Sequence, residues 1–560
     1  MEAVFDGDSG SQNSVFNVSL TGDGDITING GDGLDFGANG DNNVDEIKIT
    51  SEAGGSRTVK ISDNAGTIDN LDNSDGVTIE GDGDLTVVMN AAALDDLSVD
   101  ASNSSGTAVL SVEGNVDAAN ADNTLNAANF ANLDTLSLAG GSGAADATIA
   151  DLGDGADLEF AGSFTGNNLT FSNSNRSELT VTIDASDGAT TNVLNSNTFN
   201  VDDVSTLNVE TTNDNAVNFA NTLSANNLET LNIDSDAGGT LTIGDLTART
   251  GDAVNVSETD INVDGGQNVN IANLAVGTDM ERFNLTNDGD ANFTVTNLNL
   301  GQGETERLNI SGSGDTTITT VDDNGAAGNL QNLLITAEGS GDVTLTNVNV
   351  DTAGSTLLRI NGSNDVQIGT LTEGGFGGTN QTLDFLGDGD VNVSNLDGSF
   401  NVDNATLTID SSSSDGSGSN SLGIGSGQLQ VGAGGGAGIV DINGNQDLTI
   451  GSDSGGNRVT FNDGQNQTVD ASDFSGTLTV NAVRDNSAGT VDDHVVNFGT
   501  GDTKFQLDAA ATNGTNSDTF SFVFSGDGIG TVEISNFSDT GNAEQDVLDF
   551  SNFLATGNSS

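Results

Sequence analysis

A repeat of about 25 residues is the feature that most constrains this chain. A leucine or phenylalanine, followed two residues later by a second apolar residue, returns at nearly constant intervals. The clearest copies begin at Leu207, Leu231, Phe283, Leu308, Leu333, Leu358, Leu383 and Leu407. Their spacing is 24 or 25 residues, apart from one interval of 52 residues that is about two repeats long. A fixed period of this size indicates one structural unit stacked many times.

A second mark inside each repeat supports the same period. An aspartate follows a glycine- or serine-rich turn and precedes a second alternating segment. The copies are Asp290, Asp315, Asp342, Asp365 and Asp390, with weaker ones at Asp25, Asp84 and Asp447. The five clear copies are separated by 25, 27, 23 and 25 residues. Two independent marks therefore agree on the length of the unit.

Each unit contains two or three short alternating segments rich in Thr, Val, Ile and Asn, and the chain has no proline. Such segments, separated by Gly, Asp, Asn and Ser, are typical of β-strands. The pattern predicts an all-β chain folded as a parallel β-solenoid (β-helix) with coils of about 25 residues. Leu308, Ile310 and Ile318 are expected to face inward, with Asn309 and Thr317 facing outward.

Two other folds are compatible with part of this pattern. A leucine-rich horseshoe has a similar period, but it needs a helical or 3₁₀ back half, whereas the second half of this repeat alternates. High acidity with few aromatic residues is also typical of disordered chains. The regular alternation of apolar residues favours the β-solenoid over both.

Composition divides the predicted solenoid into regions. Residues 411–438 are rich in Gly and Ser, which suggests a hinge or a loosened coil. Phenylalanines gather in the last 70 residues, which suggests a compact β-sandwich-like or capping domain. The expected regions are an N-terminal arm or donated strand at 1–20, solenoid repeats at 21–410, the hinge at 411–438, further β repeats at 439–490 and a Phe-rich β domain at 491–560.

The charge of the chain excludes one class of partner. It carries 84 Asp and Glu against 11 Lys and Arg, a net charge of −73. Nucleic acid is excluded because phosphate binding needs clustered cations. A compact chain with this charge repels itself, so screening salt or bound cations are expected. No apolar run of about 18 residues is present, so no membrane-spanning segment is expected.

The repeating aspartates admit two interpretations. Stacked one coil apart, near 5 Å, neighbouring carboxylates would repel by about 1 kcal/mol in water. In the first interpretation, each carboxylate accepts a hydrogen bond from the backbone N–H two residues on, an Asx-turn. In the second, Ca²⁺ is held between turns by carboxylate and carbonyl oxygens. The doubled positions, Asp288 with Asp290 and Asp388 with Asp390, are the better candidates for Ca²⁺.

One segment near the N-terminus adds further candidate ligands. "GGDGLD", residues 30–35, fits the first six positions of a calcium-binding nonapeptide, and a degenerate second copy ends at Asp45. The complete set of predicted metal ligands is Asp32, Asp35, Asp45, Asp288, Asp290, Asp315, Asp342, Asp365, Asp388 and Asp390.

The C-terminal region resembles a known family. "EISNFSDTGNAEQDVLDFSNF", residues 533–553, is similar to the terminal segments of RTX-type proteins that are exported by type I secretion. "VDASDFSGTLTVNA", at 469–482, and the "LETLNI" and "MERFNL" units are similar to segments of bacterial surface-layer proteins of that group. This chain departs from the family because it lacks a tandem nonapeptide array.

The resemblance implies export without a cleaved N-terminal signal, folding outside the cell when Ca²⁺ is met, and assembly into a surface coat. The N-terminus has neither the basic start nor the apolar run of a secretory signal peptide, which agrees with such a route. The expected location is therefore the bacterial cell surface. The expected partners are other copies of the chain and cell-surface polysaccharide.

An enzyme is not expected. Polysaccharide lyases on β-helices need clustered cations, whereas Arg282, Arg307 and Arg359 are single and have the pattern of solvated partners for nearby acids. Paired carboxylates for glycoside hydrolysis arise by chance among 84 acids, and neither Trp nor Tyr is present to stack on a sugar. His494 is the only histidine and is expected to be a solvated strand residue.

Two structural roles remain open. A solenoid has two ends with unpaired strand edges, and such edges join copies unless they are capped. The first role is a self-assembling surface layer or filament. The second is a monomeric calcium-binding adhesin in which the coils form only a stalk.

Overall fold

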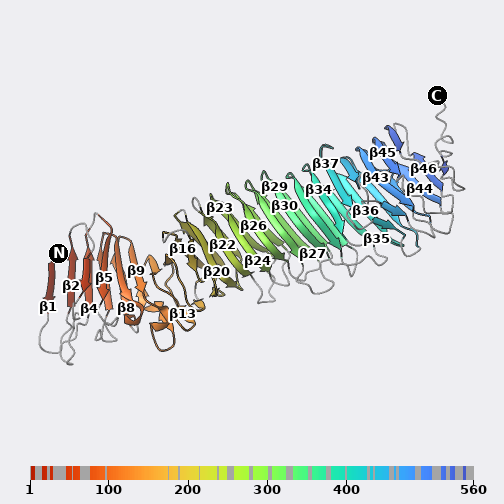
Figure 1. Ribbon diagram of the computed structural model, residues 1–560. Helices are drawn as coiled ribbons and strands as arrows, with labels where there is room; N and C mark the ends of the chain where they lie inside the picture. The colour runs from red at the N-terminus through yellow and green to blue at the C-terminus, as the bar shows by residue number, and fades with distance from the viewer. Residues whose placement is uncertain are drawn as a thin grey trace. The chain divides into compact units, whose positions relative to one another are not determined.

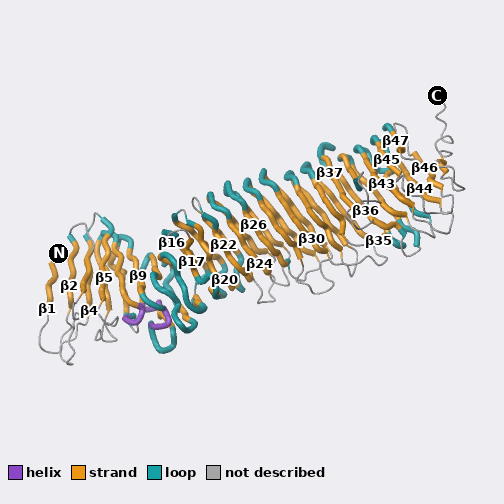
Figure 2. The backbone as a smooth tube through the Cα atoms, in the orientation of Figure 1, coloured by secondary structure: helices purple, strands orange, loops and turns teal. Residues whose placement is uncertain are grey.

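The computed structural model is almost entirely β-structure (Figures 1 and 2). It describes residues 2–6, 15–21, 26–29, 46–52, 55–62, 76–94, 97–173, 176–186, 190–213, 215–235, 239–248, 258–276, 282–300, 305–322, 332–350, 356–373, 380–397, 400–424, 429–432, 436–452, 459–461, 466–485, 493–507, 519–524, 530–535 and 547–549. Helical structure in these ranges is confined to three 3₁₀ turns, η1 (Ala91–Ala93), η2 (Val116–Ala118) and η3 (Ala127–Asn129). No helix in the described ranges is long and apolar enough to cross a membrane.

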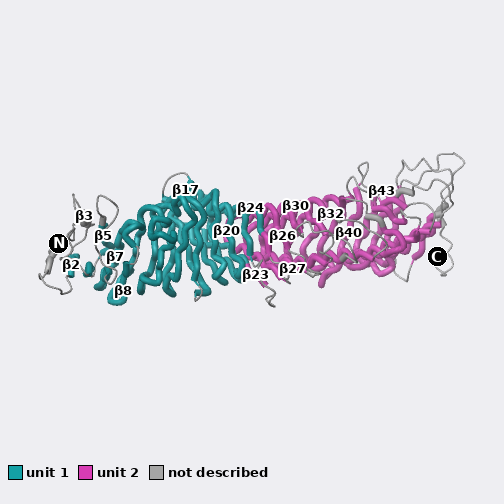
Figure 3. The backbone as a smooth tube through the Cα atoms, turned by 90° about the horizontal axis from the view of Figure 1, so that it is seen from below, with its two compact units in different colours: residues 1–252, 261–274 teal, residues 253–260, 275–560 magenta. Residues whose placement is uncertain are grey.

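The chain divides into two compact units, which Figure 3 shows in different colours. Unit 1 comprises residues 1–252 and 261–274, and unit 2 comprises residues 253–260 and 275–560. In both units the strands after β1 stack in parallel, coil on coil, with a coil spacing of about 26 residues. The predicted parallel β-solenoid is therefore confirmed, and the horseshoe is excluded because the second half of each coil is a strand.

Unit 1 contains three sets of strands. The N-terminal sheet consists of β1 (Glu2–Asp6), β2 (Val15–Leu20), β4 (Glu46–Ser51), β6 (Gly76–Gly81), β8 (Ser98–Ser104) and β11 (Phe130–Ala131). The first ladder consists of β3 (Ile26–Asn29), β5 (Arg57–Ser62), β7 (Leu85–Asn90), β9 (Ala108–Glu113), β12 (Thr135–Leu138), β14 (Asp157–Ala161), β16 (Glu178–Asp184), β19 (Thr206–Thr212) and β21 (Thr230–Ser235). The second ladder consists of β10 (Thr124–Asn126), β13 (Ala147–Ala150), β15 (Leu169–Ser172), β17 (Thr190–Val193), β18 (Thr198–Asn200), β20 (Ala216–Ala225) and β22 (Leu241–Ala248). β23 (Glu258–Gly265) and β24 (Val269–Val276) each carry residues of both units.

Unit 2 repeats the two ladders. The first ladder consists of β25 (Arg282–Asn287), β27 (Thr305–Gly312), β29 (Asn332–Gly339), β31 (Thr356–Gly362), β33 (Gln381–Leu386), β36 (Thr406–Ser412), β39 (Ile439–Gly444), β42 (Thr468–Ala471), β44 (Asp493–Phe498), β46 (Thr519–Phe524) and β48 (Val547–Asp549). The second ladder consists of β26 (Phe293–Asn299), β28 (Thr316–Asp322), β30 (Val343–Val350), β32 (Val366–Glu373), β34 (Val391–Asp397), β37 (Ser419–Ile424), β40 (Asp447–Ile450), β43 (Leu478–Asp485), β45 (Thr503–Leu507) and β47 (Val532–Ser535). A short third row consists of β35 (Phe400–Val402), β38 (Leu429–Val431) and β41 (Val459–Phe461).

Alternation of apolar and polar residues decides which side chains fill the coils. Leu308 and Ile310 on β27 are 0% and 2% exposed, and Ile318 on β28 is 0% exposed. Asn309 and Thr317 lie between these positions and are partly exposed. Because successive side chains of a strand point to opposite sides, the apolar positions of stacked coils form continuous inner rows. The predicted inward and outward residues are confirmed.

The register corrects the alignment of two repeats. Leu308 pairs with Ile335, and Leu333 pairs with the buried Glu306, so the step from β27 to β29 is 27 residues. Aligning the repeats on the leucine motif placed Leu333 opposite Leu308, which is wrong. Aligning them on the aspartates, with the step of 27 residues from Asp315 to Asp342, gives the observed register. The segment "NLLIT" contains two buried apolar residues of the same phase, Leu333 and Ile335, and the leucine motif selects Leu333, which lies two residues out of register with Leu308.

The Phe-rich region continues the solenoid. β44 and β46 pair in parallel through Val496 and Phe522, and β46 pairs in parallel with β48. The rings of Phe498 and Phe522 stack with their planes 1° apart. The described strands of 491–560 therefore form further coils instead of a separate sandwich.

The N-terminal and Gly/Ser-rich regions also carry strands. β1 pairs antiparallel with β2, while β2 pairs in parallel with β4, so the expected N-terminal arm contains an antiparallel strand pair. In the range 411–438, β37 pairs with both β34 and β40. The described part of that range is therefore an integral coil of the ladder.

Candidate functional site

In unit 2, a turn joins each strand of the first ladder to the next strand of the second ladder. In four successive coils the residue that ends this turn is an aspartate, and the residues that follow these aspartates pair in register from coil to coil. We call these four residues the aspartate row: Asp315, Asp342, Asp365 and Asp390. The sequence prediction that these residues are stacked one coil apart is confirmed.

Carboxylates of the aspartate row bind the backbone of the next coil. Asp315 Oδ1 accepts a hydrogen bond from the backbone N–H of Asp342 (3.0 Å), and Asp365 Oδ1 accepts one from Asp390 (2.9 Å). Asp390 Oδ1 accepts from the backbone N–H of Ser419 (2.7 Å). In these three contacts the donor lies on the next coil, whereas the Asx-turn interpretation placed it two residues on in the same turn. Backbone N–H groups of parallel strands point toward the neighbouring strand, where a backbone carbonyl oxygen normally accepts the hydrogen bond. Just before each of these strands begins, the aspartate carboxylate is the acceptor instead.

The same contact recurs beyond the four predicted positions. Asp447 Oδ1 accepts from Thr477 N–H (2.8 Å), and Asp502 Oδ1 accepts from Thr531 N–H (2.6 Å). The sequence interpretation treated Asp447 as a weak copy and missed Asp502. The signal for Asp502 was available, because it ends the segment "GTGD" directly before an alternating strand.

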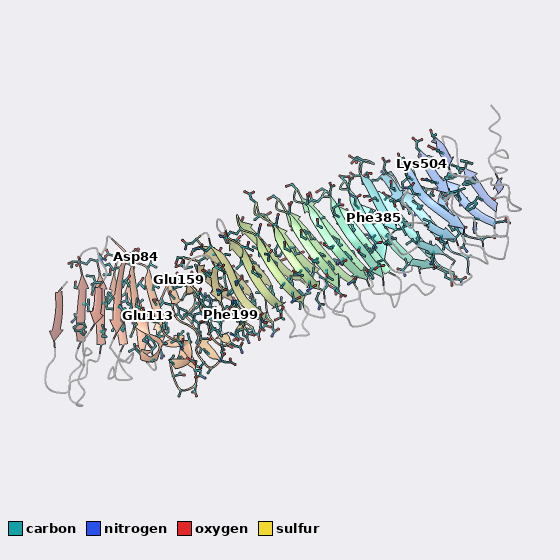
Figure 4. All side chains as sticks on the ribbon, in the orientation of Figure 1. Asp84, Glu113, Glu159, Phe199, Phe385 and Lys504 are labelled. Atoms are coloured by element: carbon teal, nitrogen blue, oxygen red, sulfur yellow. The ribbon has the colours of Figure 1, made fainter. Side chains whose placement is uncertain are left out.

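Unit 1 uses an equivalent aspartate on its first ladder. Asp84, labelled in Figure 4, precedes β7 and accepts a hydrogen bond from the backbone N–H of Thr107 at 2.9 Å. The Thr107 backbone and side-chain donors hold the pKa of the Asp84 carboxyl below its usual range. Because a hydrogen bond to the charged form favours that form, such a carboxylate stays ionised although its neighbours are acidic.

Asp290 does not belong to the aspartate row. Phe293 pairs with Thr316, so the residue stacked on Asp315 is Asn292, and Asp290 lies two residues before it. The turn between β25 and β26 is longer than its successors, and this extra length made the 25-residue spacing of Asp290 misleading.

The doubled aspartates that were predicted to hold Ca²⁺ lie in turns of unit 2. Asp288 and Asp388 are exposed in their turns, and Asp388 Oδ1 accepts a hydrogen bond from Ser414 Oγ at 3.2 Å. Across the described ranges, no group of three or more Asp, Glu or His side chains is placed to hold a metal ion. Asp32, Asp35 and Asp45 lie outside the described residues.

Glycines fix the turn that carries the aspartate row. Gly312 and Gly339 have φ of +118° and +114°, a region that L-residues rarely adopt. A Cβ atom at Gly339 would lie 2.0 Å from the carbonyl oxygen of Gly312 on the preceding coil. The turn edge therefore requires glycine both for its backbone conformation and for the close approach of successive coils.

Acids inside the first ladder behave differently from those of the turn. Asp441 on β39 pairs with Asp470 on β42, so two carboxylates are stacked on adjacent strands. Burial raises the pKa of Asp441, and the negative charge of Asp470 raises it further. Here the ionised form is disfavoured.

Two arginines of unit 2 pair with acids, as expected. Arg359 Nη2 lies 2.6 Å from Asp384 Oδ2, and Arg282 Nη1 lies 3.4 Å from Glu258 Oε1. Both are on first-ladder strands. Partly exposed ion pairs of this kind contribute about 0–1 kcal/mol each, so they balance charge locally more than they stabilise the fold.

His494 is not solvated, contrary to the sequence prediction. It is 0% exposed and lies between Phe461 and Phe520, with ring centroids 4.8 and 5.3 Å away. Its Nδ1 accepts a hydrogen bond from the backbone N–H of Gln467 at 3.3 Å. The burial pattern of β44 places His494 in phase with Val496 and Phe498. This alternation identifies it as a core residue.

Comparisons with protein-family models, with curated proteins and with solved structures give no match to this chain.

Proposed function

We propose that this chain is an extracellular structural protein that assembles with copies of itself into a surface layer or filament. The observation that carries the proposal is the repetition of one coil by parallel, in-register pairing within each unit. Solenoids present extended outer surfaces and strand edges at their ends. At the N-terminal edge, β1 is the first strand of its sheet, and among the described strands it has β2 as a neighbour on one side and no neighbour on the other. Strand edges of this kind support head-to-tail contact between copies.

Ca²⁺ supports folding and assembly in this proposal. Carboxylates of the aspartate row are stacked one coil apart, and each backbone N–H satisfies only part of their capacity to accept. Hard divalent cations are suited to such oxygens, and the described geometry fits a loosely held counterion completed by water better than a closed site. Cations at the row also lower the repulsion between copies that each carry −73.

Location at the bacterial cell surface and export by type I secretion are part of the same proposal. They rest on the resemblance of residues 533–553 to RTX-type terminal segments. The cell-surface anchor is proposed to be polysaccharide, as in the sequence interpretation.

Negative-stain electron microscopy tests the proposal. The purified chain is imaged with millimolar CaCl₂ and with excess chelator at the same ionic strength. Ordered sheets or filaments that form with CaCl₂ and vanish with chelator are expected. Isolated molecules under both conditions would sink the proposal and favour the monomeric adhesin.

A further inference from the structure

In five coils of unit 2, the outward side of the second ladder carries few charged residues. Five successive strands, β26, β28, β30, β32 and β34, each place four residues outward. We call these positions the Thr/Asn surface: Thr294, Thr296, Asn297, Asn299, Thr317, Thr319, Thr320, Asp322, Thr344, Thr346, Asn347, Asn349, Gln367, Gly369, Thr370, Thr372, Asn392, Ser394, Asn395 and Asp397. Only Asp322 and Asp397 are acidic, and none is basic.

Register makes this surface regular. Thr294 pairs with Thr317, and Thr317 pairs with Thr344. Asn347 Nδ2 donates to the carbonyl oxygen of Thr319 on the preceding coil at 3.3 Å. Equivalent polar side chains therefore return at every coil, about 4.8 Å apart, in rows along the ladder.

Charge in the same coils lies elsewhere. The aspartate row, with Asp288 and Asp388, occupies the turns, and the arginines of residues 282–397 all lie on first-ladder strands. On the described strands of these coils, the first ladder carries three arginines and three acids, whereas the second ladder carries three acids and no basic residue, so the second ladder has the fewest charged residues.

We infer that the Thr/Asn surface is where one copy of this chain packs against another. The inference rests on the proposed function, because it names a lateral contact by which copies assemble, in addition to the head-to-tail contact of strand edges. Two copies with a charge of −73 approach at lower cost on a side where each presents few charged side chains. Interface cores are likewise depleted of charged residues.

The chemistry of the surface is also self-complementary. Thr hydroxyls and Asn amides each donate and accept hydrogen bonds, whereas carboxylates only accept. Two Thr/Asn surfaces can therefore pair directly or through water, in the isologous manner of a two-fold contact. A cationic partner would be drawn instead to the aspartate row, and an apolar partner would leave these polar groups unsatisfied.

Acidic substitutions on the surface test the inference. The triple variant Thr296→Asp, Thr346→Asp and Ser394→Asp places one charge on each of β26, β30 and β34, at exposed positions. The control variant Thr286→Asp, Thr336→Asp and Thr382→Asp places three charges on the outward side of the first ladder. Both variants carry the same net charge, −73 − 3 = −76. Circular dichroism checks that each is folded.

The readout is the protein concentration at which assemblies appear in sedimentation with CaCl₂. The surface variant is expected to raise this concentration at least about tenfold over wild type, because desolvated like charges oppose contact, and the control is expected to change it less than about threefold. Equal behaviour of the two variants would overturn the inference while leaving the proposed function standing. Failure of the wild-type chain to assemble would instead overturn the proposed function, and the inference with it.

A neutral probe covers the case in which the charged variant does not fold. The chain has no cysteine, so Thr346→Cys provides a single site for a nitroxide spin label, with Asn361→Cys on β31 as the control. In the assembled protein, the spin labels on Thr346→Cys of two copies are expected to lie within about twice the length of a side chain of each other. Their proximity should broaden the electron paramagnetic resonance spectrum. The spectrum of labelled Asn361→Cys should not change on assembly. Unbroadened spectra from Thr346→Cys in assembled material would contradict the inference. Binding of neutral polysaccharide to monomers, blocked by the acidic surface variant, would assign the surface to another partner and also contradict it.

Discussion

The turn edge and the Thr/Asn surface of unit 2 belong to the same five coils, yet the sequence specifies them in opposite ways. At the turn edge, Gly339 approaches the preceding coil so closely that a Cβ has no room, and carboxylates bind the next coil's N–H groups. On the Thr/Asn surface, the outward positions vary among Thr, Asn, Ser and Gln, with one Gly and two Asp. Residue identity at the turn edge is therefore set by the backbone, whereas most outward positions of the surface share a polar character without a fixed residue; Gly369, where a Cβ would lie 2.5 Å from the Thr346 carbonyl oxygen, is an exception.

Replacing a turn glycine should have the largest effect on stability. Gly339→Ala combines an unfavourable φ of +114° with a contact of 2.0 Å to the Gly312 carbonyl oxygen. We expect a loss of about 2 kcal/mol or more in the free energy of unfolding, measured by chemical denaturation. The matched control is Gly266→Ala, where an added Cβ meets nothing within 4 Å. Equal losses of unfolding free energy in Gly339→Ala and Gly266→Ala would contradict the claim that the backbone requires glycine at the turn edge.

Removing an acceptor from the aspartate row should have an intermediate effect. Asp365→Ala deletes the acceptor of the Asp390 N–H, so we expect a loss of about 1 kcal/mol and faster hydrogen exchange at the Asp390 amide. Asp365→Asn keeps an acceptor oxygen and should restore most of the protection. If the Asp390 amide exchanges equally fast in Asp365→Asn and in Asp365→Ala, the cross-coil hydrogen bond does not stabilise the coil.

A partly buried acid of the first ladder, Asp441, should show a smaller effect of the opposite sign. The pKa of Asp441 is raised in the folded state, so protonation favours folding and stability falls as pH rises from the unfolded pKa through the folded pKa. Asp441→Asn should therefore stabilise the chain at pH 7 relative to wild type. This gain should vanish at a pH below the unfolded pKa. Thermal unfolding at both pH values measures it, and a gain that persists in acid would contradict the assigned cause.

Truncation on the Thr/Asn surface should have the smallest effect on the isolated chain. Thr346 is exposed, so Thr346→Ala is expected to change the free energy of unfolding by less than about 0.5 kcal/mol. The same denaturation experiment measures it beside Gly339→Ala. A loss comparable to that of Gly339→Ala would show that the surface, too, is fixed by the fold.

These contrasts explain what the sequence could predict. Alternation and period identify the coil and its inward residues, such as Leu308, because every coil must bury the same rows. They do not identify hydrogen-bond partners, since the donor to Asp365 lies 25 residues away and depends on the register. Register in turn depends on turn length, which shifts by two residues at Asp290 and between β27 and β29. For His494 the alternation was informative, but its polar identity was given more weight than its phase.

Sedimentation velocity of the wild-type chain tests the central claim most directly. The chain is measured at low micromolar concentration with CaCl₂, with MgCl₂, and with chelator plus NaCl of matched ionic strength. Calcium-supported self-assembly predicts large species with CaCl₂ that return to a single slow species when chelator is added. MgCl₂ should be less effective because its octahedral geometry is stricter. A single monomeric species in all three conditions would contradict the account.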